Sequence, residues 1–528
     1  MKNSFCIEGP KSVTIVPYWI PWLGHTLSFA NGGQTFLAQC SKSTKEGIFA
    51  IILRGKNYTV ITAPGIIQQL QNSHSVKPST EAMMYRLCHF FGASSIGPGL
   101  QDTLAFQKND KLLHMGSPSL SLAWEYINKL TRTLEQVVAN LISFNESWID
   151  QSSWERASRT IIQSDFDSVA EVSFFPLIES FVGEVATMVL MGKNFMENNP
   201  DIMEDLRTWD SKGTSFMNQV PWFLPQMSAA AVARQRVLRS LRRFKEVRSE
   251  YTAGKDLGSE WTDLSDVSPF IAARLGRPKR GKQSLSEKDP EISVDAVSLW
   301  AFNKPNLLIA WLLYRVYSDI SLLKRIREDI DQFVQVEQPK SELPIPEPLR
   351  VTVDAEALVS RSTLLRAVLN ETLRLHTNTI TYGVMTENLV VAEPQGASKS
   401  MADSYILRKD DFICLPHRAQ NIGLAIMDGP GNFNPDGFSS IANLKRAGAV
   451  NATSLNVFGI GGLACPGRGL AEQEIMITCA VILSMWDIDP TGGAWIWPGQ
   501  KPGLCCMLPV KDVRVNISRR KQVGRKEG

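Results

Sequence analysis

The residues best suited to chemistry surround a single cysteine near the C-terminus, where positions 458–467 read FGIGGLACPG. Glycines beside Cys465 let backbone N–H groups approach its sulfur, because no Cβ atom stands in the way. Pro466 suits the first turn of a helix, and a helix over 467–486 would favour the thiolate through its N-terminal N–H groups and dipole. This arrangement would give a haem iron a single anionic sulfur ligand.

Two other interpretations compete for the same segment. The spacing of Gly459, Gly461 and Ala464 nearly matches a dinucleotide-binding turn, with Asp487 further along the chain. However, the helix would begin past the phosphate position, and too little chain follows for the second half of a doubly wound sheet. A buried structural cysteine in a glycine-rich loop is the other interpretation, and the segment alone does not separate it from a haem ligand.

A second motif is an acid and a base one helical turn apart, Glu371 and Arg374. The same spacing occurs at Glu204–Arg207 and Glu347–Arg350, so the spacing alone has little meaning. Glu371 and Arg374 differ because they lie in an apolar helix, LLRAVLNETLRLH, where an ion pair must be buried and satisfied.

These two motifs, in this order and with short predicted strands between them, resemble the cytochrome P-450 family of haem-thiolate enzymes. The segment FNPDGF at 433–438 is similar to the family's loop before the cysteine. Pro17, Pro21 and Gly24 resemble its proline-rich N-terminal hinge. The likeness covers residues 15 to 510, nearly the whole chain. The chain resembles most the fungal members of the family that act in secondary metabolism.

The resemblance implies a fold and a cofactor. The expected fold class is mainly α with a minor β sheet (α+β), the cytochrome P-450 fold. It would be a single large triangular domain with haem between the central helix and the cysteine loop. Cys465 would be the metal ligand, bound to the haem iron through its thiolate. The other implied cofactor-binding residues are Phe458, Gly461, Gly467, Glu371 and Arg374.

The central helix is predicted over 293–319 and departs from the family at 301–306, AFNKPN. Family members usually carry an acid and an alcohol here, and this segment has neither an acid nor a threonine. Pro305 lacks an N–H and its ring clashes with the preceding turn, so the helix should kink. Asn303, Lys304 and Pro305 are the residues expected to shape the catalytic, oxygen side. The preceding LWA is similar to prostacyclin synthase and to sterol hydroxylases of the bile-acid pathway.

Several arginines of the family are missing. Leu463, Gly437 and Gly383 stand where an arginine is usual, and the helical Trp-x-x-x-Arg motif is absent at Trp124. Unpaired buried propionates would be costly, so other groups are expected to replace these arginines, or the haem is held loosely. The candidate replacements are Lys129, Arg132, His114 and His376.

The composition narrows the class of protein. The 528 residues are 44% hydrophobic and 21% charged, with 56 Lys and Arg against 53 Asp and Glu. These values are typical of globular proteins, and the nearly neutral charge gives no reason to expect nucleic acid as a partner. Eight cysteines without a CxxC pair, and six histidines without HxxxH, argue against structural zinc and for a reducing environment.

Three parts are expected along the chain: a Pro/Trp-rich lead-in at 1–24, the haem domain at 25–510 and a basic C-terminal tail at 511–528. The apolar segment 13–23 has 11 residues, against roughly 20 for a membrane-spanning helix. Its Trp19 and Trp22 suit either a membrane surface or packing on the domain. The resemblance implies the endoplasmic reticulum membrane, on its cytosolic face.

The expected function is a monooxygenase that oxidises a hydrophobic small molecule, a terpenoid or polyketide, in secondary-metabolite biosynthesis. It would use O2 and electrons passed from NADPH by an NADPH–cytochrome P-450 reductase. The segment 303–305 leaves open a haem-thiolate isomerase or dehydratase that needs no reductase. The missing arginines leave open a haem-poor, non-catalytic member of the family.

Overall fold

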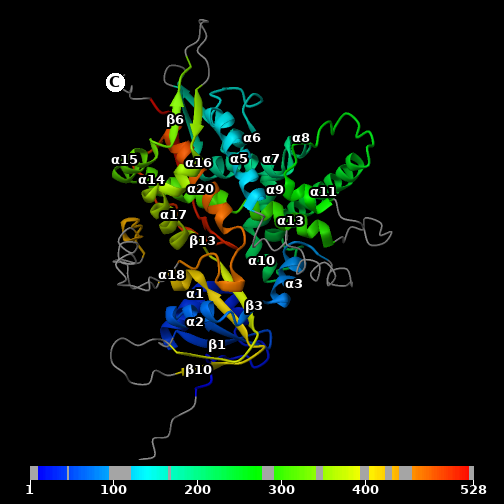
Figure 1. The fold of residues 1–528 in the computed structure, drawn as a ribbon, viewed down its shortest axis with the longest axis vertical. Helices are drawn as coiled ribbons and strands as arrows, with labels where there is room; N and C mark the ends of the chain where they lie inside the picture. The colour runs from blue at the N-terminus through cyan, green and yellow to red at the C-terminus, as the bar shows by residue number, and fades with distance from the viewer. Residues whose placement is uncertain are drawn as a thin grey trace, which may run out of the picture. The chain divides into compact units, whose positions relative to one another are not determined.

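The computed structural model describes residues 10–44, 47–93, 120–164, 168–275, 290–339, 349–392, 404–422, 431–438 and 455–521. The chain divides into two compact units (Figure 1). Unit 1 comprises Met1–Arg86, Leu373–Asn432 and Ser440–Cys465, and unit 2 comprises Leu87–Thr372, Phe433–Ser439 and Pro466–Gly528. The predicted fold class, mainly helical with minor sheets, is confirmed.

Unit 1 is built on a five-stranded sheet that joins distant parts of the chain. β1 (Ile48–Leu53) and β2 (Lys56–Ile61) form a hairpin whose tight turn places Arg54 and Gly55 at φ 52° and 76°. These positive values match the two-residue turns that fit the twist of a hairpin. β11 (Phe412–Pro416) runs parallel to β2, so strands drawn in blue and yellow lie side by side in Figure 1.

The other elements of unit 1 cover this sheet or extend it. β8 (Ile380–Met385) lies between β11 and β3 (Val76–Pro78). The core of unit 1 includes Ile48, Ile61, Leu70, Met385 and Ile413, each 2% exposed or less. The remaining elements are α1 (Thr26–Thr44), α2 (Pro64–Ser73), β9 (Leu389–Ala392), β10 (Ser404–Leu407), α18 (His417–Ile422) and η2 (Gly461–Leu463). α3 (Thr80–His89) continues from unit 1 into unit 2.

Unit 2 has a helical centre. α7 (Phe174–Met191) contacts α5 (Leu120–Val137) and α14 (Pro305–Tyr317), and α20 (Arg468–Met485) also contacts both of these helices. α7 is apolar enough and long enough to cross a bilayer, but 78% of it is buried inside the protein. A helix that is apolar on all sides and covered on all sides belongs to a protein core.

The remaining elements of unit 2 surround these helices. The helices are α6 (Ser153–Ala157), α8 (Lys193–Asn198), α9 (Ile202–Ser211), α10 (Gly213–Met217), α11 (Pro225–Thr252), α12 (Pro269–Leu275), α13 (Pro290–Phe302), α15 (Ile320–Ile330), α16 (Ala355–Arg361) and η1 (Val138–Asn140). Two strand pairs are β6 (Val334–Glu337) with β7 (Arg350–Val353) and β13 (Gln500–Pro502) with β14 (Met507–Pro509). α17 (Thr363–His376) continues from unit 2 into unit 1.

The central helix is broken where the sequence predicts a kink. α13 ends at Phe302 and α14 begins at Pro305, so the predicted element over 293–319 forms two helices. Proline is well tolerated in the first turn of a helix, because an N–H there has no partner within the helix. The break at 303–304 confirms the prediction from Pro305.

The predicted tail over 511–528 is wrong for residues 514–519. β15 (Arg514–Arg519) lies between β12 (Trp486–Pro490) and β5 (Val169–Ser173), and β4 (Ile161–Ser164) completes the four-stranded sheet. Val515 and Ile517 alternate into the core and are fully buried. Of the basic residues that indicated a tail, Arg514 is paired within the sheet, with Glu171. Residues 522–528 lie outside the described part of the chain.

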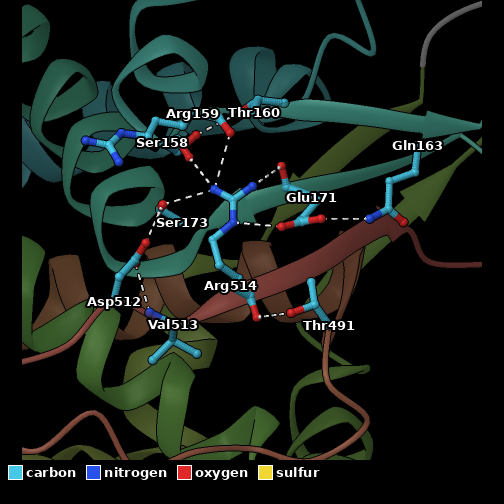
Figure 2. Close-up of polar contacts among 10 residues, drawn as sticks. All are labelled: Ser158, Arg159, Thr160, Gln163, Glu171, Ser173, Thr491, Asp512, Val513 and Arg514. Atoms are coloured by element: carbon cyan, nitrogen blue, oxygen red, sulfur yellow. Dashed lines mark hydrogen bonds and ion pairs between the residues drawn. The ribbon is translucent and has the colours of Figure 1, made fainter.

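Arg514 shows how such a charge is neutralised (Figure 2). Its Nε donates to Glu171 on β5 at 2.9 Å, and its Nη1 donates to the carbonyl of Ser158 and to Ser173 Oγ at 3.2 and 3.1 Å. Ser173 in turn donates to Asp512. A guanidinium with several acceptors is satisfied in a fixed position, so this arginine fastens β15 to β5.

Candidate active site

The cysteine loop folds back on itself through short hydrogen bonds. Leu463 N donates to Ile460 O at 2.8 Å and Ala464 N donates to Gly461 O at 3.1 Å, which forms the turn η2. Cys465 N then donates to Phe458 O. The predicted cofactor residues Phe458, Gly461 and Cys465 therefore lie in one compact turn. Gly467 is the N-cap of α20, which begins one residue later, at Arg468.

Two glycines of the loop adopt a backbone that side chains disfavour. Gly459 has φ 82°, and a Cβ atom there would lie 2.3 Å from the carbonyl oxygen of Leu463. Gly461 has φ 47°. Gly467 differs, because its φ is −81° and a Cβ atom there would meet no atom within 4 Å. The tight position is thus Gly459, which sequence reasoning did not include among the cofactor-binding residues.

Cys465 is exposed, whereas Cys40, Cys414, Cys479 and Cys506 are buried. This exposure excludes the interpretation of Cys465 as a buried structural cysteine. An accessible thiol on a turn with no side chain at Gly461 or Gly462 suits a flat ligand that must approach the sulfur closely. The residues present therefore fit a haem bound through the Cys465 thiolate.

Glu371 and Arg374 are both fully buried on α17, as predicted for this motif. Glu371 Oε1 accepts a hydrogen bond from Asn434 N at 2.8 Å. Arg374 Nη2 donates to the carbonyl of Asn432 at 3.1 Å. Both side chains thus bind backbone of the segment that precedes the cysteine loop in sequence. By contrast Glu204, from another pair with the same spacing, is exposed.

A different arginine supports this segment in place of the one missing at 437. Arg315 on α14 lies over the rings of Phe433 and Trp497, with its guanidinium 5.2 and 4.4 Å from their centres. Burial lowers the pKa of Arg315 to about 10, and its interactions with Tyr314 and Glu371 oppose that shift. Sequence reasoning missed Arg315, although an arginine within the apolar run LLYRVY was a signal for a buried, partnered charge.

Two other positions that lack the usual arginine, Gly383 and Leu463, lie together in an apolar part of unit 1. A Cβ atom at Gly383 would lie 2.5 Å from Val76 Cγ1 and 2.9 Å from Leu463 Cδ1. An arginine at 383 would therefore not fit.

The candidate replacements for these arginines have other surroundings. Lys129 donates to the carbonyls of Asp266 and Val189. Arg132 is exposed, His376 is buried on α17, and His114 lies outside the described residues. Lys129 is therefore bound within unit 2, and the choice among the others stays a prediction.

Asn303 holds the break in the central helix. Its Nδ2 donates to Thr187 Oγ1 on α7 at 3.1 Å and to Leu299 O at 2.8 Å, while its Oδ1 accepts from Asn306 at 2.9 Å. Asn303 thus ties α13, α14 and α7 together. This contact with Thr187 was not predicted, because the sequence gives no register between α7 and the central helix.

Lys304 forms an ion pair with a distant helix. Its Nζ lies 2.5 Å from Asp210 Oδ1 on α9 and 4.3 Å from the ring centre of Trp300. Trp300 Nε1 also donates to Asp210 Oδ1, at 2.7 Å. Burial by itself lowers the pKa of Lys304, but Asp210 has the opposite effect and the net result is a raised pKa. Lys304 is therefore a cation at neutral pH, and burial raises the pKa of nearby Glu179 to about 7.

Aromatic side chains surround this ion pair. Phe90 stacks on Trp209 with ring centres 4.8 Å apart, and Phe91 meets Trp300 edge-on at 5.6 Å. Trp300 lies three residues before Asn303, which the sequence predicted to shape the catalytic side. The polar partner Asp210 was not predicted, because it comes from a helix about 90 residues earlier.

The comparisons with known proteins agree with this geometry. A family model described as Cytochrome P-450 matches residues 15–512. Cytochrome P-450 monooxygenase poxD of Penicillium oxalicum is 19% identical over 93% of this chain and 90% of its own length. Cytochrome P-450 monooxygenase nodJ of Hypoxylon pulicicidum is 22% identical over 93% and 85%. Cytochrome P-450 7B1 of Mus musculus is 23% identical over 91% and 85%.

A solved structure, the retinoic acid bound cyanobacterial CYP120A1, matches 96% of this chain and 100% of its own length. The TM-score is 0.63 and the sequence identity is 17%, so this likeness concerns the fold. The predicted fold is thereby confirmed. The exposed cysteine turn, the buried Glu371 and Arg374 and the match over residues 15–512 lead to one conclusion. The chain belongs to the cytochrome P-450 family and is an oxidoreductase of the monooxygenase type.

Proposed function

We propose that the protein oxidises a hydrophobic small molecule, using O2 and electrons that a partner reductase passes from NADPH. The observation that carries this proposal is the exposed Cys465 on its glycine turn, directly before α20. When bound there, a haem with a thiolate ligand supplies the chemistry that activates O2 and inserts one oxygen atom into an unreactive C–H bond.

The protein's own residues position the groups that this chemistry needs. Cys465 supplies the ligand, and the turn formed by Phe458 to Ala464 fixes where its sulfur lies. Glu371 and Arg374 hold the segment 432–434, and Arg315 supports it. The aromatic side chains near Trp300 favour an apolar substrate, because they exclude water and offer ring faces for packing.

The substrate class that we propose is a terpenoid or polyketide of secondary metabolism. The fungal monooxygenases among the relatives support this class, as does the aromatic character of the residues around Trp300. At about 20% identity, the relatives indicate a class of substrate and not a particular compound.

The first experiment is the absorption difference spectrum of the dithionite-reduced protein with and without carbon monoxide. A strongly red-shifted Soret band is expected for thiolate ligation, and Cys465→Ala should abolish it. A wild-type band at the position of imidazole-ligated haem, or no band, would contradict the proposal and favour a haem-poor protein.

The second experiment separates oxygenation from rearrangement. Product formation should require NADPH, a reductase and O2 together, and one atom of 18O2 should enter the product. Turnover without NADPH or reductase would instead support an isomerase or dehydratase, which the broken helix without an acid or a threonine at 301–306 leaves available.

We also propose that the protein contacts the cytosolic face of the endoplasmic reticulum membrane. The support is a set of exposed aromatic side chains: Trp19 and Trp22 are 99% and 80% exposed, and Trp222 and Phe223 are each 67% exposed. Tryptophan favours the membrane–water interface. Trp19→Ser with Trp22→Ser should lower sedimentation with lipid vesicles, whereas Trp148→Ser, at a side chain 56% exposed, should not. Equal binding by all three proteins would contradict this proposal.

A further inference from the structure

The ion pair between Lys304 and Asp210 lies among aromatic side chains of unit 2, with Glu179 nearby. Each side chain is only 20% exposed, and the pair joins the break between α13 and α14 to α9. Removing two charges from water is expensive, and a single buried ion pair seldom repays that cost in stability. A hydrophobic pair of similar size would serve packing as well or better, so stability is a weak explanation for this pair.

The pair also keeps hydrogen-bonding capacity. An ammonium group has three N–H donors, and within the described part of the chain Lys304 uses them toward one oxygen of Asp210 and the face of Trp300. That Asp210 oxygen, Oδ1, also accepts from Trp300 Nε1, at 2.7 Å. Each side chain is 20% exposed, so the pair is not sealed from a ligand.

The surroundings of the pair are aromatic. Trp300 and Phe91 meet edge-on, and Phe90 and Trp209 stack behind them, both fully buried. A molecule held against these rings would be mainly apolar. A ligand without polar atoms would cover the open N–H of Lys304 and leave it without a partner, which costs free energy. A ligand oxygen placed there would avoid this cost.

We propose that Lys304, oriented by Asp210 and Trp300, binds an oxygen acceptor on the substrate, so that the substrate is a hydrophobic molecule that carries a carbonyl or carboxylate group. Lys304 Nζ donates to that oxygen, and Asp210 keeps the ammonium group charged and directed. This inference rests on the proposed function, because it names the substrate class of the same site. The chain then discriminates against pure hydrocarbons of the same size, since these leave the ammonium unpaired.

The test uses the full-length, haem-loaded protein and three probes of equal chain length: decane, decan-2-one and decanoic acid. Equilibrium dialysis gives the dissociation constant of each probe independently of turnover. Wild-type protein should bind the ketone or the acid about tenfold more tightly than decane, the fold-change that one charge-assisted hydrogen bond provides. A preference for the acid over the ketone would identify a carboxylate, and the reverse would identify a carbonyl.

Variants assign the preference to the pair. Lys304→Met keeps the length of the side chain and should reduce the preference for the oxygenated probes to less than about threefold, with the affinity for decane unchanged. Lys304→Arg should retain part of the preference. Lys193→Met, which removes a lysine in an exposed ion pair with Glu197, is the matched control and should behave as wild type.

Two results would overturn the inference: equal affinity of the wild-type protein for all three probes, or an equal loss of affinity for all three in Lys304→Met. If Lys304→Met does not fold, Asp210→Asn gives the same comparison, because it removes the charge that orients Lys304. The carbon monoxide spectrum of each protein is measured separately. A protein that lacks the thiolate band but prefers oxygenated probes would contradict the proposed function and not this inference.

Discussion

At the residue scale, exposure and backbone conformation distinguish the reactive cysteine from the structural ones. Cys465 is accessible on a turn that closes through backbone hydrogen bonds, whereas Cys414 and Cys479 are buried in apolar surroundings. Burial raises the pKa of both buried thiols, which keeps them protonated and inert. The surroundings of each cysteine, rather than its residue type, therefore decide which one is suited to bind a metal.

Gly459→Ala should damage the cysteine turn. A Cβ atom at φ 82° and 2.3 Å from Leu463 O forces the turn to open, at a cost of about 1–3 kcal/mol. Thermal unfolding should show a lower midpoint, and the carbon monoxide difference band should weaken. Gly467→Ala is the matched control, because its φ of −81° and open surroundings accept a methyl group. Equal damage by both substitutions would contradict this explanation.

Glu474 should make stability depend on pH. It is fully buried on α20, its carboxylate oxygens have no partner among the described residues, and burial raises its pKa to about 8. Between about pH 4.5 and 8 the unfolded chain ionises this group while the folded protein keeps it neutral. The free energy of unfolding therefore falls as pH rises through this window, by up to about 1.4 kcal/mol per pH unit.

Glu474→Gln should reduce this dependence, because an amide stays neutral at every pH in the window. Glu179, whose pKa burial raises to about 7, should keep part of the slope. The measurement is the urea midpoint at pH 5, 6.5 and 8 in each protein. Glu472→Gln serves as control: its carboxylate lies on the same helix but is paired with Arg468 at 2.8 Å. A pH slope in Glu474→Gln as steep as that of the wild-type protein would show that another group causes it.

At the scale of elements, the central helix depends on a contact that joins three helices. Asn303 at the break donates to Thr187 on α7 and accepts from Asn306 on α14. Proline explains why the helix is interrupted, and these side chains explain why α13 and α14 keep a fixed position on α7. The local sequence thus causes the break, and tertiary contacts fix the position of the two helices that meet there.

Thr187→Val should lower the free energy of unfolding by about 1–2 kcal/mol, because the fully buried Thr187 loses its hydrogen bond from Asn303 while its volume stays similar. A double-mutant cycle with Asn303→Leu gives the coupling between the two side chains. We expect about 1 kcal/mol of coupling from urea unfolding, and a coupling near zero would mean that the contact adds nothing.

The parts of the site that the sequence predicted correctly have local causes. The cysteine turn follows from glycine and proline positions within ten residues, the kink follows from Pro305, and the burial of Glu371 and Arg374 follows from the apolar helix around them. Asp210, Thr187 and Arg315 were missed for a different reason. Each contributes through the packing of one helix against an element far along the chain, and that register is set by tertiary structure.

At the scale of the whole molecule, a strand from near the end of the chain completes a sheet of unit 2. Unit 2 brings its last strand, β15, between two earlier ones, where Val515 and Ile517 are fully buried. The sequence predicted a tail here because basic residues dominate the C-terminal segment. The alternating apolar residues of RVNISR were the signal for a strand, but the prediction gave more weight to the basic residues around them.

Truncation after residue 513 should therefore prevent folding of unit 2, because it removes a strand with neighbours on both sides and two buried apolar residues. Truncation after residue 521 should leave the unfolding midpoint unchanged, since β15 and its contacts remain. Soluble yield and thermal unfolding distinguish the two proteins. A stable protein after truncation at 513 would contradict the importance of β15.

The parallel pairing of β2 with β11 has a consequence for how the protein is made. β2 leaves the ribosome about 350 residues before β11, so its sheet edge stays without a partner for roughly 20–70 s at typical synthesis rates. β1 is apolar and β2 ends in three β-branched residues, Thr59–Ile61, which makes a free edge prone to aggregate. The nascent chain must therefore be protected through most of its synthesis, and chaperone supply should limit the yield of the recombinant protein.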